Sequence, residues 1–141
     1  MSAAAVAAGA VAVESANVVG VTTVNATQGK FYMIGAQFED VGGGEMAIQD
    51  FVTGTFNGVD FDDQFQFLQT APKLQVWTPG DYIMCYYLND AYDTVNSTDQ
   101  NDVLVPGWAD NGGDLRTDSF PIGTAAWFKA STDVDITFAA L

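Results

Sequence analysis

The sequence lacks histidine altogether and contains a single cysteine. Nucleophilic triads need a basic partner such as histidine, and zinc and most transition-metal sites need clusters of histidine or cysteine. No glycine-rich loop carries the lysine of a P-loop, so phosphate cradling of that kind is not expected. We therefore expect a protein that is not an enzyme. The alternative is an acid-pair hydrolase, which needs only two carboxylates, such as Asp62 with Asp63 or Asp99 with Asp102.

The single cysteine, Cys85, cannot form an intramolecular disulfide. It lies in the apolar run from Tyr82 to Leu88, where a free thiol packs as a small hydrophobic side chain. With no histidine in the chain to activate it, this thiol is a poor nucleophile. The sequence therefore predicts that Cys85 is buried and inert.

Basic residues are also few, and they are scattered along the chain as Lys30, Lys73, Arg116 and Lys129. Nucleic-acid binding and attraction to anionic lipids both depend on a concentrated positive charge. Neither nucleic acid nor an anionic membrane is therefore expected as a partner.

Acidic residues, by contrast, number 18 and give a formal net charge of −14. Fifteen of the 18 are aspartate, a residue that prefers turns and caps to helix interiors. Hydrophobic residues still make up 48% of the chain, which is enough for a packed core. The composition predicts a folded chain that carries its negative charge in the loops between strands.

Short alternating runs of apolar and polar residues recur along the sequence, most clearly in Asp133–Phe138, as half-buried strands require. Other expected strands are 17–24, 31–38, 64–67, 74–76, 82–88, 103–105 and 124–128. Gly and Pro separate these runs, including Gly42–Gly44 and Pro106-Gly107, which read as turns. One helical turn or two is expected at 45–52. The fold class expected is all-β, an antiparallel sandwich or barrel of about seven to nine strands with at most one short helix.

Residues 1–16 differ from the remainder, because Ala3–Val13 is an unbroken run of small apolar residues. The run suits a signal peptide and is shorter than the roughly 20 residues that span a bilayer. We expect a signal-peptide remnant, hence a secreted or cell-surface protein, followed by a single β-sandwich domain over 17–141. Since such signals begin with a basic residue and the first one here is Lys30, either the chain is truncated or its initiator lies upstream.

The alternative for the same segment is that it persists in the mature protein. Its apolar side chains could then add as a strand to a neighbouring subunit and join copies head to tail. The residues expected to make this assembly contact are Val6, Val11 and Val13.

Two acidic stretches have the oxygen-rich character of calcium loops. Calcium takes 6–8 oxygen ligands from carboxylates, amides and carbonyls and needs neither nitrogen nor sulfur. The alternative is that these residues serve only as turns and caps. The candidate ligands are Asp60, Asp62, Asp63, Asp110, Asn111 and Asp114.

Aromatic residues gather between positions 77 and 108, and exposed rings among them could stack on sugars. Trp108 follows Pro106-Gly107 and is the best candidate for an exposed platform, with Trp77 as a second ligand-binding residue. The alternative is that these rings belong to the core, where aromatics commonly pack.

Several short motifs together resemble small uncharacterised secreted or cell-surface β-proteins of environmental bacteria. They are the Ala-rich leader followed by Asn17-Val18-Val19-Gly20, and the segments 29–35, 74–77 and 123–128, the last reading GTAAWF. The resemblance implies export and an extracellular β-domain, and it provides no active site to carry over.

The function expected from these patterns is that of a secreted, non-catalytic structural or surface-assembly β-domain. It would form homo-oligomers, with a self-assembling extracellular filament as one form. The alternative is a calcium-assisted carbohydrate-binding module, with a glycan as its partner.

Overall fold

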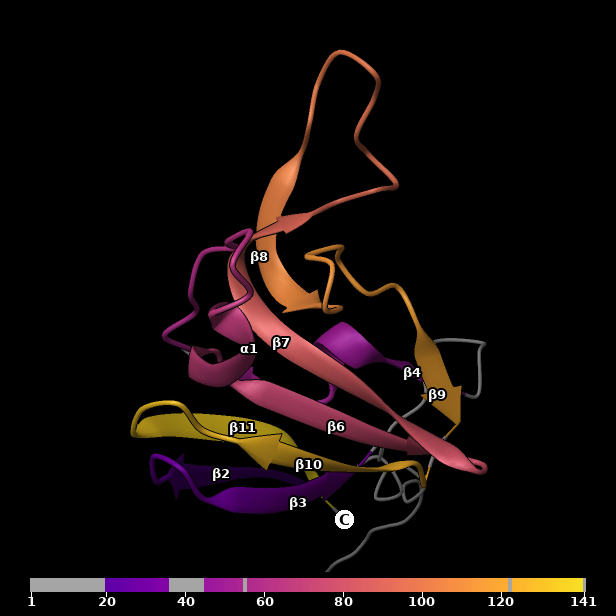
Figure 1. Cartoon of the computed structure of the whole chain (residues 1–141). Coiled ribbons are helices and arrows are strands. Elements are labelled where there is room, and N and C mark those ends of the chain that lie inside the picture. The colour runs from indigo at the N-terminus through magenta and orange to yellow at the C-terminus, as the bar shows by residue number, and fades with distance from the viewer. Residues whose placement is uncertain (1–19, 36–44, 55, 122, 141) are drawn as a thin grey trace, which may run out of the picture.

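The computed structural model describes residues 20–35, 45–54, 56–121 and 123–140 (Figure 1). The expected leader at 1–16, with Val6, Val11 and Val13, and the expected turn at Gly42–Gly44 lie outside these residues. Nothing in the structure therefore tests them.

Strands dominate the described residues, and they form three sheets whose ladders are all antiparallel. The large sheet has the order β3 (Phe31–Gly35), β10 (Ala125–Lys129), β6 (Lys73–Thr78), β7 (Asp81–Tyr92) and β8 (Leu104–Ala109). A second sheet has the order β2 (Gly20–Ala26), β11 (Val134–Ala140) and β5 (Thr53–Gly54). The third pairs β4 (Glu45–Ala47) with β9 (Ser119–Pro121).

The expected all-β antiparallel class is confirmed, and the sheets do not close into a barrel. Helical structure in the described residues is limited to a 3₁₀ turn, η2 (Ile48–Asp50), and one turn of helix, α1 (Phe67–Thr70). The helical turn expected at 45–52 is confirmed only for its second half, since Glu45–Ala47 is strand β4. No helix among the described residues is long and apolar enough to cross a membrane.

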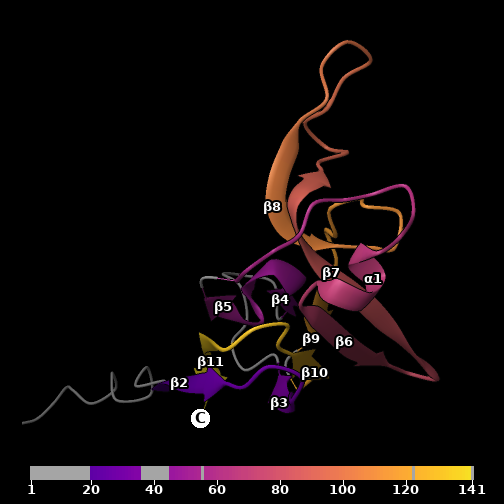
Figure 2. The ribbon, with the colours of Figure 1, turned by 60° about the vertical axis from the view of Figure 1, so that its left-hand side comes forward.

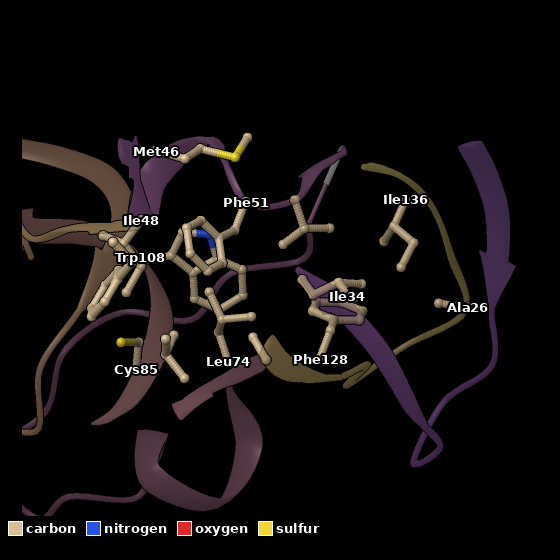
Figure 3. Packing of buried hydrophobic residues seen from close by; sticks show 14 of the residues in the cluster. Ala26, Ile34, Met46, Ile48, Phe51, Leu74, Cys85, Trp108, Phe128 and Ile136 are labelled. Carbon is tan, nitrogen blue, oxygen red and sulfur yellow. The ribbon is translucent and has the colours of Figure 1, made fainter. Parts of the chain in front are cut away.

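Side chains on one face of the large sheet build the main core (Figure 3). Leu74 and Val76 of β6 and Phe128 of β10 alternate with outward-facing neighbours and are fully buried. Ile136 of β11 and Met46 of β4 belong to the same cluster. All three sheets therefore share this core, because each contributes buried apolar side chains to it.

The opposite face of the large sheet, which we call the outer face, is covered over only part of its area. Phe67 of α1 packs there on Leu88 and Ala91 of β7 and Ala109 of β8, forming a second, smaller buried cluster. Phe61 and Tyr86 pack against this cluster. Within the part of the chain that the structure describes, the rows of the sheet farther from α1 keep large apolar side chains exposed.

Two expectations about local structure are wrong. Phe65 and Phe67 do not alternate along a strand, since Phe67 begins α1 and Phe65 precedes it with φ +58°. Pro106-Gly107 is not a turn but lies inside β8. Proline is tolerated there because β8 is an edge strand, where a missing N–H need not disrupt a ladder on both sides.

Candidate functional site

The uncovered part of the outer face is built by alternate residues of four neighbouring strands. On β3, Phe31 and Met33 point away from the core, because Tyr32 and Ile34 pack into it. The same alternation places Trp127 on the outer face, directly opposite Met33 and next to Gln75 of β6. Four strands thus bring together apolar side chains that lie far apart in the sequence.

These side chains are exposed to an unusual degree for large apolar groups. Phe31 is 56% exposed, Met33 63%, and Trp77 and Tyr82 are each 47% exposed. Trp77 and Tyr82 are cross-strand partners whose rings meet edge to face with centroids 5.8 Å apart. Isolated exposed apolar residues are ordinary, but a contiguous patch marks an interaction surface.

A shallow groove of about 310 Å³ runs over this patch, lined by Phe31, Gln75, Trp77 and Trp127. The rings of Phe31 and Trp127 meet edge to face with centroids 6.4 Å apart. Gln75 contributes the polar side chain among the groove's lining residues. The groove can therefore bind a flat apolar surface and offer it one amide for hydrogen bonding.

Two lysines border the patch on its side nearest α1. Lys73 of β6 and Lys129 of β10 are directly opposite in the ladder, and the Lys129 Nζ lies 5.3 Å from the centre of the Phe31 ring. Partial burial, and secondarily the charge of Lys129, lowers the pKa of Lys73. Positive charge is thus concentrated beside the aromatic groove of an acidic molecule.

Trp77 is exposed in this patch and its role in ligand binding stays a prediction, but the expectation that Trp108 forms an exposed platform is wrong. Trp108 is 1% exposed and packs edge to face against Tyr87, Phe56 and Phe128 in the main core. Its backbone is held by Gln49, which accepts a hydrogen bond from the Trp108 N–H and donates one to its carbonyl, both at 2.9 Å. The ring faces inward because Trp108 lies within β8 and not in a turn.

In the first acidic stretch, carboxylates act mainly as acceptors for nearby backbone. Both oxygens of Asp62 accept backbone N–H groups, from Gln64 and Gln66 on Oδ1 and from Phe67 on Oδ2. The Asp60 carboxylate accepts a hydrogen bond from the amide of Asn89. Asp63 is exposed.

In the second stretch, Asp110 Oδ1 accepts the N–H groups of Gly112 and Asp114, while Asn111 and Asp114 are exposed. A groove of about 310 Å³ lined by Phe61 and Asp114, among others, shows that the two stretches lie close together.

No three acidic, cysteine or histidine side chains gather as a metal site within the described residues. The turn-forming role weighed for these aspartates is confirmed for Asp62 and Asp110. Calcium binding stays a prediction.

Cys85 is buried, as the sequence predicts. Burial raises the pKa of its thiol to about 12, so the thiolate that would act as a nucleophile is scarce at neutral pH.

Sequence reasoning missed Phe31, Met33, Trp127 and the facing lysines as site residues. The alternation along 31–35 does show that Phe31 and Met33 share one side of a strand. It does not show which side of the strand is left exposed, because that depends on which face of the large sheet the other two sheets pack against.

Comparisons of the chain with models of protein families, with curated proteins and with solved structures find no match. The resemblance to secreted bacterial β-proteins therefore stays a prediction. What the molecule does must be inferred from the chemistry of the outer face and of the acidic loops.

Proposed function

We propose that the chain is a secreted, non-catalytic structural β-domain that assembles with other copies at the cell surface or in the extracellular space. The observation that carries this proposal is a contiguous apolar patch that the described residues leave exposed on the outer face, formed mainly by Phe31, Met33, Trp77 and Tyr82. A chain with a net charge of −14 has enough polar residues to cover its surface without exposing large apolar side chains. A contiguous apolar patch on such a surface is therefore best explained as a contact site for another molecule.

The composition of the patch suits a protein contact. Aromatic residues and methionine are enriched in the buried centres of interfaces, where they exclude water and supply most of the binding energy. Polar and charged groups form the rim of such interfaces, and Lys73 and Lys129 border the aromatic groove in this way. The apolar leader-like run at 1–16 supports the export part of the proposal.

The non-catalytic part of the proposal is supported by the residue types present. The chain has no histidine to act as a general base. Its single thiol is buried, with a pKa raised to about 12. Two acid pairs could serve a hydrolase. In one of them, the carboxylate of Asp62 already accepts hydrogen bonds from the backbone leading into α1.

The test is the assembly state of the purified chain measured by sedimentation velocity over a wide concentration range. We expect the wild-type chain to self-associate, and the double variant Met33→Ser/Trp77→Ser to remain monomeric because the apolar contact is lost. Phe65→Asn is the matched control. It removes another exposed ring, and its φ of +58° is one that asparagine tolerates. A wild-type chain that remains monomeric at every concentration would contradict the proposal.

The groove also favours a second candidate function, a carbohydrate-binding module. Trp77 and Trp127 together with the Gln75 amide provide rings for stacking on a sugar and a polar group for its hydroxyls. Retardation of the chain in gels containing soluble polysaccharide, abolished in Trp77→Ala, would support it. If calcium assists, retardation should decrease with EDTA and calcium should raise the Tm.

A further inference from the structure

The three lysines of the chain lie close to one another in the fold. Lys73 and Lys129 are cross-strand partners, Lys129 is also opposite Phe31, and Lys30 immediately precedes Phe31. The fourth basic residue, Arg116, forms a two-pronged ion pair with Asp118 at 2.8 and 2.9 Å. Lys73 and Lys129 therefore place positive charge at one edge of the apolar patch.

Like charges placed directly opposite each other destabilise a sheet. Lys73 and Lys129 occupy such positions, and partial burial together with the Lys129 charge lowers the pKa of Lys73. A carboxylate placed between the two ammonium groups would relieve their repulsion and strengthen both interactions. The outer face thus offers an apolar centre flanked by a site for an acidic group.

At the far end of β7 lies a second surface, which combines exposed apolar side chains with negative charge where the outer face has positive charge. The connection between β7 and β8, residues 93–103, projects beyond the remainder of the molecule (Figures 1 and 2). It carries the exposed Asp99 and Asp102, together with Val95, which is 71% exposed, and Leu104 follows it at 56%. We call residues 93–104 the acidic tip.

The acidic tip is braced by its own hydrogen bonds. The carboxylate of Asp93 accepts the backbone N–H groups of Val95 and Asn96 and the Asn96 side-chain amide. Thr98 and Asn101 exchange two backbone hydrogen bonds, at 2.9 and 3.1 Å. A projecting loop that is already ordered loses less conformational entropy when it binds.

We propose that the outer face of one copy binds the acidic tip of a second copy, so that Asp99 and Asp102 meet Lys73 and Lys129 while Val95 and Leu104 cover the aromatic groove. This inference rests on the proposed assembly function and names the surface that each copy contributes. The two surfaces differ, so the contact is heterologous and leaves a free face at one end and a free tip at the other. Copies therefore add head to tail, into an open chain unless the rotation between successive copies closes a ring.

Charge argues against the simplest symmetric alternative, in which two outer faces pack on each other. That arrangement brings two copies of the Lys73–Lys129 pair into one interface, and juxtaposed like charges are costly there. The acidic tip instead brings the opposite charge to the same place.

Two charge-reversal variants test this contact. The face variant is Lys73→Glu/Lys129→Glu, and the tip variant is Asp99→Lys/Asp102→Lys. We expect each variant alone to self-associate at least about tenfold more weakly than the wild type, because attraction becomes repulsion at one side of the contact. An equal mixture should recover assembly, because the intact tip of the face variant meets the intact face of the tip variant, and the reversed lysine tip and glutamate face again carry opposite charges. Sedimentation velocity and light scattering measure both results.

The control variant is Asp50→Lys/Asp63→Lys, which changes the net charge as the tip variant does but at exposed positions elsewhere. It should assemble at least as well as the wild type. Circular dichroism melting verifies that each variant is folded. A folded tip variant that assembles like the wild type would overturn the contact and leave the assembly function standing. A wild-type chain that is monomeric, whether or not it binds polysaccharide, would overturn both.

Discussion

At the scale of single residues, the aspartates of this protein act mainly through the backbone. Asp62 accepts N–H groups from Gln64, Gln66 and Phe67 at 3.0–3.2 Å, which holds the chain in the turn that leads into α1. Asp110 does the same for Gly112 and Asp114. Since a short aspartate side chain reaches N–H groups two to five residues ahead, these carboxylates fix loop conformations that the sheet depends on.

Replacing Asp62 with alanine should lower the free energy of unfolding by about 1–2 kcal/mol, because three N–H groups lose their acceptor and α1 covers part of the outer face. Urea denaturation followed by fluorescence measures the change. Asp63→Ala is the control at the exposed neighbouring acid, where a change within about 0.5 kcal/mol is expected. Equal effects of the two substitutions would show that Asp62 has no capping role.

Among the described residues, Cys85 is the one whose ionisation the fold most strongly opposes. Because burial raises its thiol pKa to about 12, the native chain at pH 8 should react with a thiol reagent only as fast as it opens, and immediately in denaturant. The folded pKa lies above the unfolded one, so this contribution to stability is complete below about pH 8.5 and is lost as the pH rises toward 12. Rapid native labelling at pH 8 would contradict the burial.

At the scale of elements, the alternating pattern predicted the strands that have one face in the core. The clearest case is 133–138, where β11 forms and Ile136 is buried. The pattern failed at Phe65 and Phe67, because the hydrogen bonds of Asp62 bend the chain into a turn that a period of two cannot reveal. A different signal failed at Trp108, because Pro106-Gly107 reads as a turn in the sequence, whereas proline and glycine are acceptable inside an edge strand.

Two glycines at turns allow the cost of backbone strain to be measured separately from the cost of steric overlap when a side chain is introduced. Gly80, in the β6–β7 turn, and Gly113, beside Phe61, both have positive φ, at +84° and +89°. A Cβ at Gly80 meets nothing within 4 Å, whereas one at Gly113 lies 2.6 Å from the Phe61 ring.

Gly80→Ala should therefore cost about 1 kcal/mol of stability from the backbone alone. Gly113→Ala should cost about 2–4 kcal/mol, because the overlap with an aromatic ring adds to the same backbone strain. Chemical denaturation of both variants measures the difference. Equal costs would mean that Phe61 moves away freely and that the loop at 110–114 is not tightly packed on it.

At the scale of the whole molecule, the arrangement of charge and exposed apolar area could not be read from the sequence. The four basic residues are scattered along the chain, yet the antiparallel pairing of β10 with β3 and β6 brings the three lysines together. Which face of the large sheet is exposed depends on where the other two sheets pack, and α1 covers part of that exposed face. The candidate site is thus a property of tertiary structure, and only Trp77 was identified beforehand.

The net charge of −14 should make the folded state sensitive to salt, because crowded carboxylates repel one another more in the compact chain than in the unfolded one. Raising NaCl from about 0.01 to about 0.15 M shortens the screening length from about 30 to about 8 Å and should raise the Tm by a few °C. Calorimetry of a dilute solution of the Met33→Ser/Trp77→Ser variant measures the Tm at both salt concentrations without interference from assembly. Introducing Asp50→Lys/Asp63→Lys into that background removes part of the repulsion and should reduce the rise. A Tm that falls with added salt would instead show that attraction between opposite charges outweighs repulsion within one copy.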